Sequence, residues 1–172
     1  MNKSLVKFLP ILLLAAIMLP ACEQASTQVK SDAARVLQPD VPAGKLDTLV
    51  AGNNTFALDL YQSLRTSGDN LFYSPFSISL ALGMTYGGAR GVTEAQMADV
   101  LHFDLPQDEL HPAFNQLDLN LASSGEAENE DLQPMQLDIV NAVWGQQGYP
   151  FLPAYLDLLA LNYGAGINLA DF

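Results

Sequence analysis

The 172-residue sequence predicts a domain of mixed α-helices and β-strands whose sheet is incomplete. Apolar residues recur at helical spacing in five segments, whereas only three short segments have the pattern of strands. One of these strands, ending at residue 144, is apolar on both faces and is therefore predicted to lie in the centre of a sheet. A central strand needs a neighbour on each side to pair its backbone groups, and the sequence supplies too few strands for this.

The first half of the domain is predicted to begin with two helices. An apolar stripe over Leu46–Leu64 predicts the first helix, with Asp47 as its cap and Gly68 at its end. The apolar run Leu71–Tyr73 then predicts a brief strand. The next segment, Ser77–Tyr86, is apolar nearly all round, which is typical of a helix buried on every side.

Two further helices are predicted before the next strand. Thr93 and Gln96 have the spacing of a capping box for a helix that runs to about Leu101. A second amphipathic stripe, over residues 110–121, predicts another helix. Pro112 is acceptable there only in the first turn, because proline cannot donate a backbone hydrogen bond.

The end of the chain predicts a strand, a helix and a strand. Residues 137–144 first alternate between apolar and polar and then become apolar on both faces. Pro153 is placed to open a helix, and Gly164 is placed to end it. Ile167 and Leu169 indicate a last short strand.

The charge balance excludes several classes of partner. The chain has 7 Lys and Arg residues against 19 Asp and Glu residues, a net charge of −12. Removal of residues 1–21 would leave 5 basic residues against the same 19 acidic ones, a net charge of −14. A nucleic-acid-binding protein needs a basic stripe to displace phosphate counterions, so no nucleic-acid partner is expected. Electrostatic binding to anionic lipid is excluded for the same reason.

The N-terminus predicts export. Lys3 and Lys7 precede an apolar run over residues 8–19, which is shorter than the roughly 20 residues of a membrane-spanning helix. This is the pattern of a secretory signal peptide. Cys22, the only cysteine, follows directly, so no intrachain disulfide can form.

The ending Leu-Pro-Ala-Cys resembles the bacterial lipoprotein signal. The resemblance implies cleavage after residue 21 and acylation of Cys22, which would anchor an exported chain to the cell envelope. A plain signal peptide with an incidental cysteine is the alternative. Residues 22–46 are polar and contain two prolines, which predicts a flexible tether between the anchor and a domain over residues 47–172.

Three segments resemble the N-terminal part of the serpin family of protease inhibitors, over roughly residues 53–172. They are NTFALDLYQSL, NLFYSPFSISLALGMTYGGARGVTEAQMADVLHF and NAVWGQQGYPFLPAYLDLLALNYGAGINLADF. The resemblance implies an α+β fold, of which this chain would hold helices A to E and isolated strands of sheets A and B. The buried helix would be helix B, the strand over residues 137–144 would lie in sheet A, and helix E and an edge strand of sheet A would follow.

The resemblance also implies a function. A serpin is not an enzyme but an inhibitor of serine-type endopeptidases, and it presents a reactive loop that inserts into sheet A after cleavage. That loop belongs to the C-terminal part of the family, so these 172 residues are expected to be inactive by themselves, and a target protease is expected only for a full-length protein. A non-inhibitory exported lipoprotein that acts as a binding module is the alternative.

Two serines are the candidate site residues. Ser74 and Ser77 match the serines of the family's shutter region, where sheet A parts to admit the loop. The other interpretation, which is compatible with the first, is that Ser77 caps the buried helix and Ser74 ends a strand. Some serpins bind heparin-type polyanions through a basic helix D, but residues 108–121 contain no Lys or Arg, so no such partner is expected.

No other catalytic, cofactor or metal-binding motif is present in the sequence. His102 and His111 are expected to be surface residues, since no ligand spacing involves them. The acidic loop that contains Glu126, Glu128, Glu130 and Asp131 is expected to be solvated rather than to hold a cation.

Overall fold

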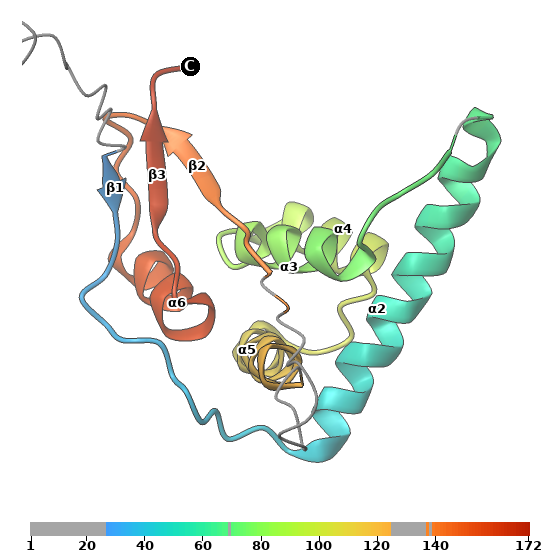
Figure 1. Cartoon of the computed structure of the whole chain (residues 1–172). Helices are drawn as coiled ribbons and strands as arrows, with labels where there is room; N and C mark the ends of the chain where they lie inside the picture. Colours follow the sequence, from blue (N-terminus) through green and yellow to red (C-terminus); the bar gives the residue numbers. More distant parts are fainter. Residues whose placement is uncertain (1–26, 69, 125–136, 138) are drawn as a thin grey trace, which may run out of the picture.

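The computed structural model describes residues 27–68, 70–124, 137 and 139–172. In chain order the elements are β1 (Gln28–Val29), α2 (Ala43–Leu64), the 3-10 turn η1 (Arg65–Ser67), α3 (Pro75–Tyr86), α4 (Gly91–Leu101), α5 (Gln107–Ser123), β2 (Val143–Gln146), α6 (Pro153–Tyr163) and β3 (Ile167–Ala170). The sheet and α6 lie on one side of the molecule and the long helix α2 on the other, with α3, α4 and α5 between them (Figure 1). The predicted mixture of helices with a small, incomplete sheet is confirmed.

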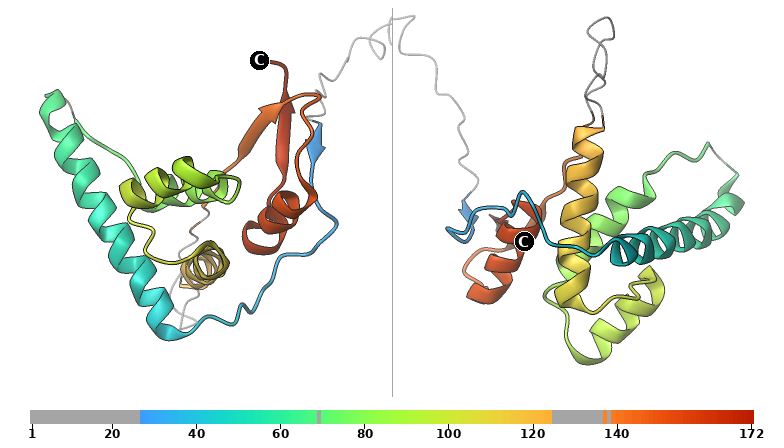
Figure 2. Two further views of the ribbon diagram at one scale, coloured as in Figure 1. Left: turned by 180° about the vertical axis from the view of Figure 1, so that it is seen from behind. Right: turned by 90° about the horizontal axis from the view of Figure 1, so that it is seen from below.

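Helix α2 begins earlier than predicted. Its first residue is Ala43, directly after Pro42, so Asp47 lies inside the helix and is not its cap. Gly68 follows η1 with a φ of 79°, which is the left-handed conformation expected of a glycine that ends a helix. Figure 2 shows the full length of α2 from two further directions.

Helix α3 is less buried than its sequence predicts. Leu80, Met84 and Tyr86 are among its buried residues. Leu82, which is 37% exposed, and Thr85 lie on an exposed side, so the helix is not buried all round. The strand predicted just before it is wrong: Leu71–Tyr73 is extended but pairs with no strand in the described part of the chain, and Phe72 is fully exposed. A strand needs a partner, and an apolar run alone does not supply one.

The predicted capping box of α4 is also wrong. The helix begins at Gly91, two residues before Thr93, and its N-cap Arg90 makes no side-chain capping bond. The carboxylate of Glu94 instead accepts a hydrogen bond of 2.8 Å from the Gln107 side chain. Helix α4 is therefore held at its start by the neighbouring α5 rather than by its own cap.

Helix α5 contains Pro112 in its second turn, one turn later than the sequence analysis allowed. The helix therefore lacks the bond that an N–H at this position would donate to the carbonyl of Asp108. Packing outweighs this loss, because four residues close to Pro112 have no exposed surface: Leu110, Ala113, Phe114 and Asn115.

The sheet has the strand order β1-β3-β2. The central strand β3 is antiparallel to β1, with Val29 opposite Ile167, and parallel to β2, with Trp144 opposite Asn168. The strand predicted to be central is thus an edge strand, and it spans only Val143–Gln146. Apolar side chains of this segment are therefore exposed to solvent: Trp144 is 56% exposed, and Val140, just before the strand, is 86% exposed.

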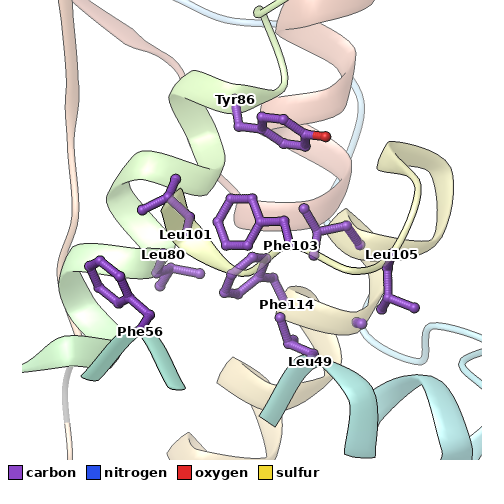
Figure 3. Close-up of a cluster of buried hydrophobic side chains, with 10 residues drawn as sticks. Leu49, Phe56, Leu80, Tyr86, Leu101, Phe103, Leu105 and Phe114 are labelled. Atoms are coloured by element: carbon purple, nitrogen blue, oxygen red, sulfur yellow. The ribbon is translucent and has the colours of Figure 1, made fainter. Parts of the chain in front are cut away.

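Two apolar clusters hold the fold together. The larger lies between α2, α3, α4 and α5 (Figure 3), and its buried members are Leu49, Phe56, Leu80, Tyr86, Leu101, Phe103, Leu105, Leu110, Ala113 and Phe114. The rings of Phe103 and Phe114 meet edge to face with their centroids 5.6 Å apart. The smaller cluster joins α3 and α6 to the sheet through Met84, Leu159 and Ile167.

Residues 27–46 of the predicted tether, which spans residues 22–46, lie within the described part of the chain. Residues 28 and 29 form β1, and the backbone N–H of Val36 donates a hydrogen bond of 2.9 Å to the carbonyl of Leu161 in α6. The segment then continues around the molecule to the start of α2 (Figure 1). The predicted signal peptide, Cys22 and the acidic loop residues Glu126, Glu128, Glu130 and Asp131 lie outside the described residues.

Candidate functional site

The two candidate serines form the start of α3. Ser74 has extended backbone angles, and Pro75 follows as the first helical residue. The Oγ atom of Ser74 accepts a hydrogen bond of 3.3 Å from the backbone N–H of Ser77 and one of 3.0 Å from the Ser77 hydroxyl. The cap of the helix is therefore Ser74 and not Ser77, as the sequence-based interpretation had assigned it.

A polar hollow of about 270 Å³ lies beside α3, where the chain enters β2. It is lined by Leu80 of α3, by residues 139–142 that lead into β2, by Tyr163 and Asn168, and by Arg35 and Asp118. In the described part of the chain β2 pairs with β3 alone, so this hollow lies beside an edge strand of the sheet.

Two buried polar atoms, one on α3 and one in the segment that leads into β2, have no partner among the described residues. They are the hydroxyl of Ser79, a residue with no exposed surface, and the side-chain nitrogen of Asn141. An unpaired buried polar group costs about 1–3 kcal/mol, so such atoms mark positions where a partner is expected. Sequence analysis did not single out Ser79, although a serine within an otherwise apolar helix was the available signal.

His111 is buried, which contradicts its predicted place at the surface. Its side chain lies between α5 and α6, where Nδ1 and the Tyr163 hydroxyl share a hydrogen bond of 2.6 Å. Burial, with a smaller contribution from Arg90, lowers the pKa of His111 to about 4. Burial also raises the pKa of Tyr163, so both groups are neutral at pH 7. His102 is partly exposed, and its Nε2 lies 2.8 Å from Asp59.

The arrangement supports hydrogen bonding and packing rather than bond cleavage. Both hydroxyls at the start of α3 bond within that turn, and no imidazole or carboxylate of the described residues is hydrogen-bonded to them. In the part of the chain that the structure describes, no three His, Cys, Asp or Glu side chains gather in a way that could hold a metal ion.

Comparison with known proteins places these features in a family. The family model of serpins, serine protease inhibitors, matches residues 51–172. A leukocyte elastase inhibitor of Sus scrofa is 40% identical over 129 residues, which are 74% of this chain and 32% of that protein. An uncharacterized serpin-like protein of Thermococcus kodakarensis is 36% identical over 140 residues, which are 77% of this chain and 32% of that protein.

The solved structure of emu ovalbumin (Dromaius novaehollandiae) has a similar fold. It matches with a TM-score of 0.52 and 24% sequence identity over 72% of this chain and 34% of the ovalbumin chain. The likeness confirms the predicted fold class, an N-terminal portion of a serpin-type α+β fold. The chain spans about a third of the length of the relatives it matches. With its family model matched over residues 51–172, the chain belongs to the serpin family.

Proposed function

We propose that this chain is the N-terminal portion of an exported, lipid-anchored inhibitor of serine-type endopeptidases. The observation that carries the proposal is the match of residues 51–172 to the serpin family model. Relatives named leukocyte elastase inhibitor, 40% identical in Sus scrofa and 37% in Mus musculus, support an inhibitory activity over an enzymatic one. Inhibition would require the residues that those relatives have beyond the matched third.

The geometry at α3 supports a part in sheet opening. The two serine hydroxyls and the unpartnered Ser79 hydroxyl lie at the start of a buried helix that packs against β2. Hydrogen bonds of this kind can be exchanged when a neighbouring strand moves, whereas close apolar packing at the same place would resist the movement. We therefore assign Ser74 and Ser77 to the shutter of the inhibitory sheet.

The test uses the protein isolated from cells that carry the intact gene. An inhibitor of this family holds its protease as an acyl-enzyme, so mixing with an elastase-type protease should give a covalent complex that survives boiling in SDS. The 172-residue chain expressed by itself should give none. A protein from the intact gene that is simply degraded by a panel of serine proteases would overturn the inhibitor proposal.

The second candidate is a non-inhibitory lipoprotein that acts as a binding module. The observation in its favour is that the described residues already bury a substantial core, which is joined to the sheet through a second apolar cluster. If this candidate is correct, the protein from the intact gene forms no covalent complex with any protease, yet the 172-residue chain unfolds cooperatively as a monomer.

Lipid anchoring through Cys22 rests on the sequence pattern around that residue. Within residues 27–68, 70–124, 137 and 139–172, the helices are too short or too polar to cross a membrane. Growth with an alkyne-labelled fatty acid should label the protein in a bacterial host and carry it to the membrane fraction, and Cys22→Ala should abolish both effects. A labelled Cys22→Ala variant would contradict the assignment.

We also propose that the protein does not bind heparin-type polyanions. Helix α5, in the position of the family's helix D, carries Asp108, Glu109 and Asp118 and no basic residue. Two cations beside α5 are already paired, Arg35 with Asp118 at 2.7 Å and Lys45 with Glu109 at 2.6 Å. A third, Arg90, donates a hydrogen bond of 3.3 Å to the Gln107 side chain. Salt-sensitive retention of the protein on a heparin column would contradict this proposal.

A further inference from the structure

The segment before α2 occupies a site that α5, α6 and β3 provide together. We propose that residues 27–36, called the latch below, are a docked segment whose strand β1 closes the outer edge of the sheet, and that α5, α6 and β3 form a binding site for it. The latch precedes residue 51, where the match to the serpin family model begins, and the proposal does not depend on protease inhibition.

The strongest evidence is the partner set of Asn115 in α5. This side chain has no exposed surface, and both of its polar ends bind the latch. Its Oδ1 accepts a hydrogen bond of 2.8 Å from Nε of Arg35, and its Nδ2 donates one of 2.7 Å to the carbonyl of Val36. Without the latch, a buried amide would lose both partners, which folded proteins rarely tolerate.

The Arg35 side chain makes the latch specific. While its Nε binds Asn115, its Nη2 donates a charge-assisted bond of 2.7 Å to Asp118, one turn further along α5. Both members of this ion pair are mostly buried, with exposed fractions of 23% for Arg35 and 19% for Asp118. Lysine could not replace Arg35, because a single ammonium group cannot reach two acceptors in this forked geometry.

The loop between α6 and β3 is shaped for close contact with the latch. A Cβ atom on Gly166 would lie 2.6 Å from Cβ of Lys30 and 2.8 Å from the carbonyl oxygen of Val29, and its nearest neighbours would all be latch atoms. Gly164, with a φ of +61°, lies against the Arg35 side chain in the same way. Glycines at these two positions allow the backbone of the latch to approach.

The other bonds fasten the latch along its length. The backbone N–H of Leu169 in β3 donates a hydrogen bond of 2.8 Å to the carbonyl of Thr27, and the Val36 N–H reaches Leu161 in α6 at 2.9 Å. The Ser31 hydroxyl donates to the Asp157 carboxylate. With the latch absent, the outer edge of β3 would present unpaired backbone groups, where an extended segment can add as a strand.

Little apolar surface holds the latch, because its residues alternate between exposed and partly buried from Gln28 to Val36. Its attachment therefore depends on a small number of hydrogen bonds, which makes it a local unit that can open without global unfolding. The first test measures this opening by amide hydrogen exchange in the 172-residue chain.

Two variants, Gly166→Ala and Arg35→Gln, should speed hydrogen exchange of the Leu169 and Val36 amides by about tenfold or more. The alanine side chain would push the latch backbone away from residue 166, and the glutamine would remove the charged hydrogen bond to Asp118. Exchange in α3 and α4 should be unchanged, which shows that the variants are folded. Gly44→Ala is the matched control, because its Cβ would meet nothing within 4 Å. Equal exchange at Leu169 and Val36 in Gly166→Ala and Gly44→Ala would overturn the proposal.

The second test supplies the latch from outside. A fluorescein-labelled peptide of residues 26–38 is titrated, by fluorescence polarisation, into a chain whose own latch is disabled by Val29→Pro and Arg35→Ala. The peptide should bind this chain at least about tenfold more tightly than it binds the same chain with Asn115→Leu added. A peptide that carries Arg35→Ala should bind the chain more weakly than the unchanged peptide does. Equal affinity in all three titrations would overturn the proposal.

Discussion

The Nδ1 atom of His111 lies 2.6 Å from the hydroxyl oxygen of Tyr163, and this hydrogen bond joins α5 to α6. His111 is 2% exposed, and the same region contains the Arg90 guanidinium, which further disfavours a charged imidazole. The pair therefore links the packing of two helices to the protonation of a single side chain.

Stability should fall in mild acid because of this pair. The pKa of His111 is about 4 in the folded chain, whereas an unfolded imidazole titrates near about 6.5, so the unfolded chain binds more protons between these values. The free energy of unfolding contributed by His111 is thus fully present above about pH 6.5 and is lost as pH falls towards 4, by roughly 3 kcal/mol.

Urea unfolding between pH 4 and 7 measures this effect. His111→Gln should have a smaller pH dependence than the parent chain in that interval, although its stability at pH 7 is lower. His102→Gln is the control, because it removes the imidazole that pairs with Asp59 outside the α5–α6 contact. Parallel pH curves for the parent chain and His111→Gln would refute the prediction.

The cap of α3 should be measurable separately from the second serine. Ser74→Ala removes the acceptor of two hydrogen bonds and should lower the free energy of unfolding by about 1 kcal/mol. Ser77→Ala should cost less, because the Ser77 backbone N–H keeps its acceptor, and Ser74→Asn should restore most of the loss. Denaturant titrations decide the matter, and a larger loss for Ser77→Ala than for Ser74→Ala would reverse the assignment of the cap.

The larger core depends on Phe114, which has no exposed surface and packs against Phe76 and Phe103. Phe114→Ala should lower the free energy of unfolding by about 3–5 kcal/mol, through lost burial and the cavity left behind. Phe72→Ala is the matched control, since this ring is fully exposed and its loss should change stability by less than about 0.5 kcal/mol. Similar losses for the two variants in thermal unfolding would contradict the packing described.

The exposed edge next to β2 should promote self-association. Val140 is 86% exposed beside the unpaired side of the sheet, and an exposed apolar edge pairs readily with another chain. Val140→Lys should slow aggregation of the 172-residue chain, as followed by light scattering at 37 °C. Val92→Lys adds the same charge on α4, at a residue 74% exposed, and should have little effect if the edge is responsible. Equal slowing by both substitutions would indicate that only net charge matters.

Local signals predicted the end of the chain well. Pro153 and Gly164 bound α6 as expected, because a proline at the first position and a glycine with positive φ after the last act through the backbone itself. Helix α3 was also predictable as a helix, although the absence of a polar face overstated its burial, since Leu82 and Thr85 are exposed. The cap of α3 was expected at Ser77, but the structure has it at Ser74, one turn earlier.

Predictions failed where a distant part of the chain decided the outcome. His111 is buried because α6 packs over α5 and offers the Tyr163 hydroxyl, a contact between residues 52 positions apart. Among the described residues, the strand predicted at Leu71–Tyr73 has no other strand to pair with. The polar composition of residues 27–36 concealed their hydrogen bonds to α5, which lie about 80 positions further along the chain.

The partner set of Asn115 has a consequence for how the sequence can change over generations. Linkers usually accumulate substitutions freely, because few contacts constrain them. Here, a change at Arg35 removes the donor to the buried Asn115 Oδ1 and the cation paired with Asp118, and a change at Asn115 removes the acceptor of the Arg35 Nε–H. We expect close homologues to keep or lose these two residues together, so that the segment before α2 diverges as slowly as the core it touches.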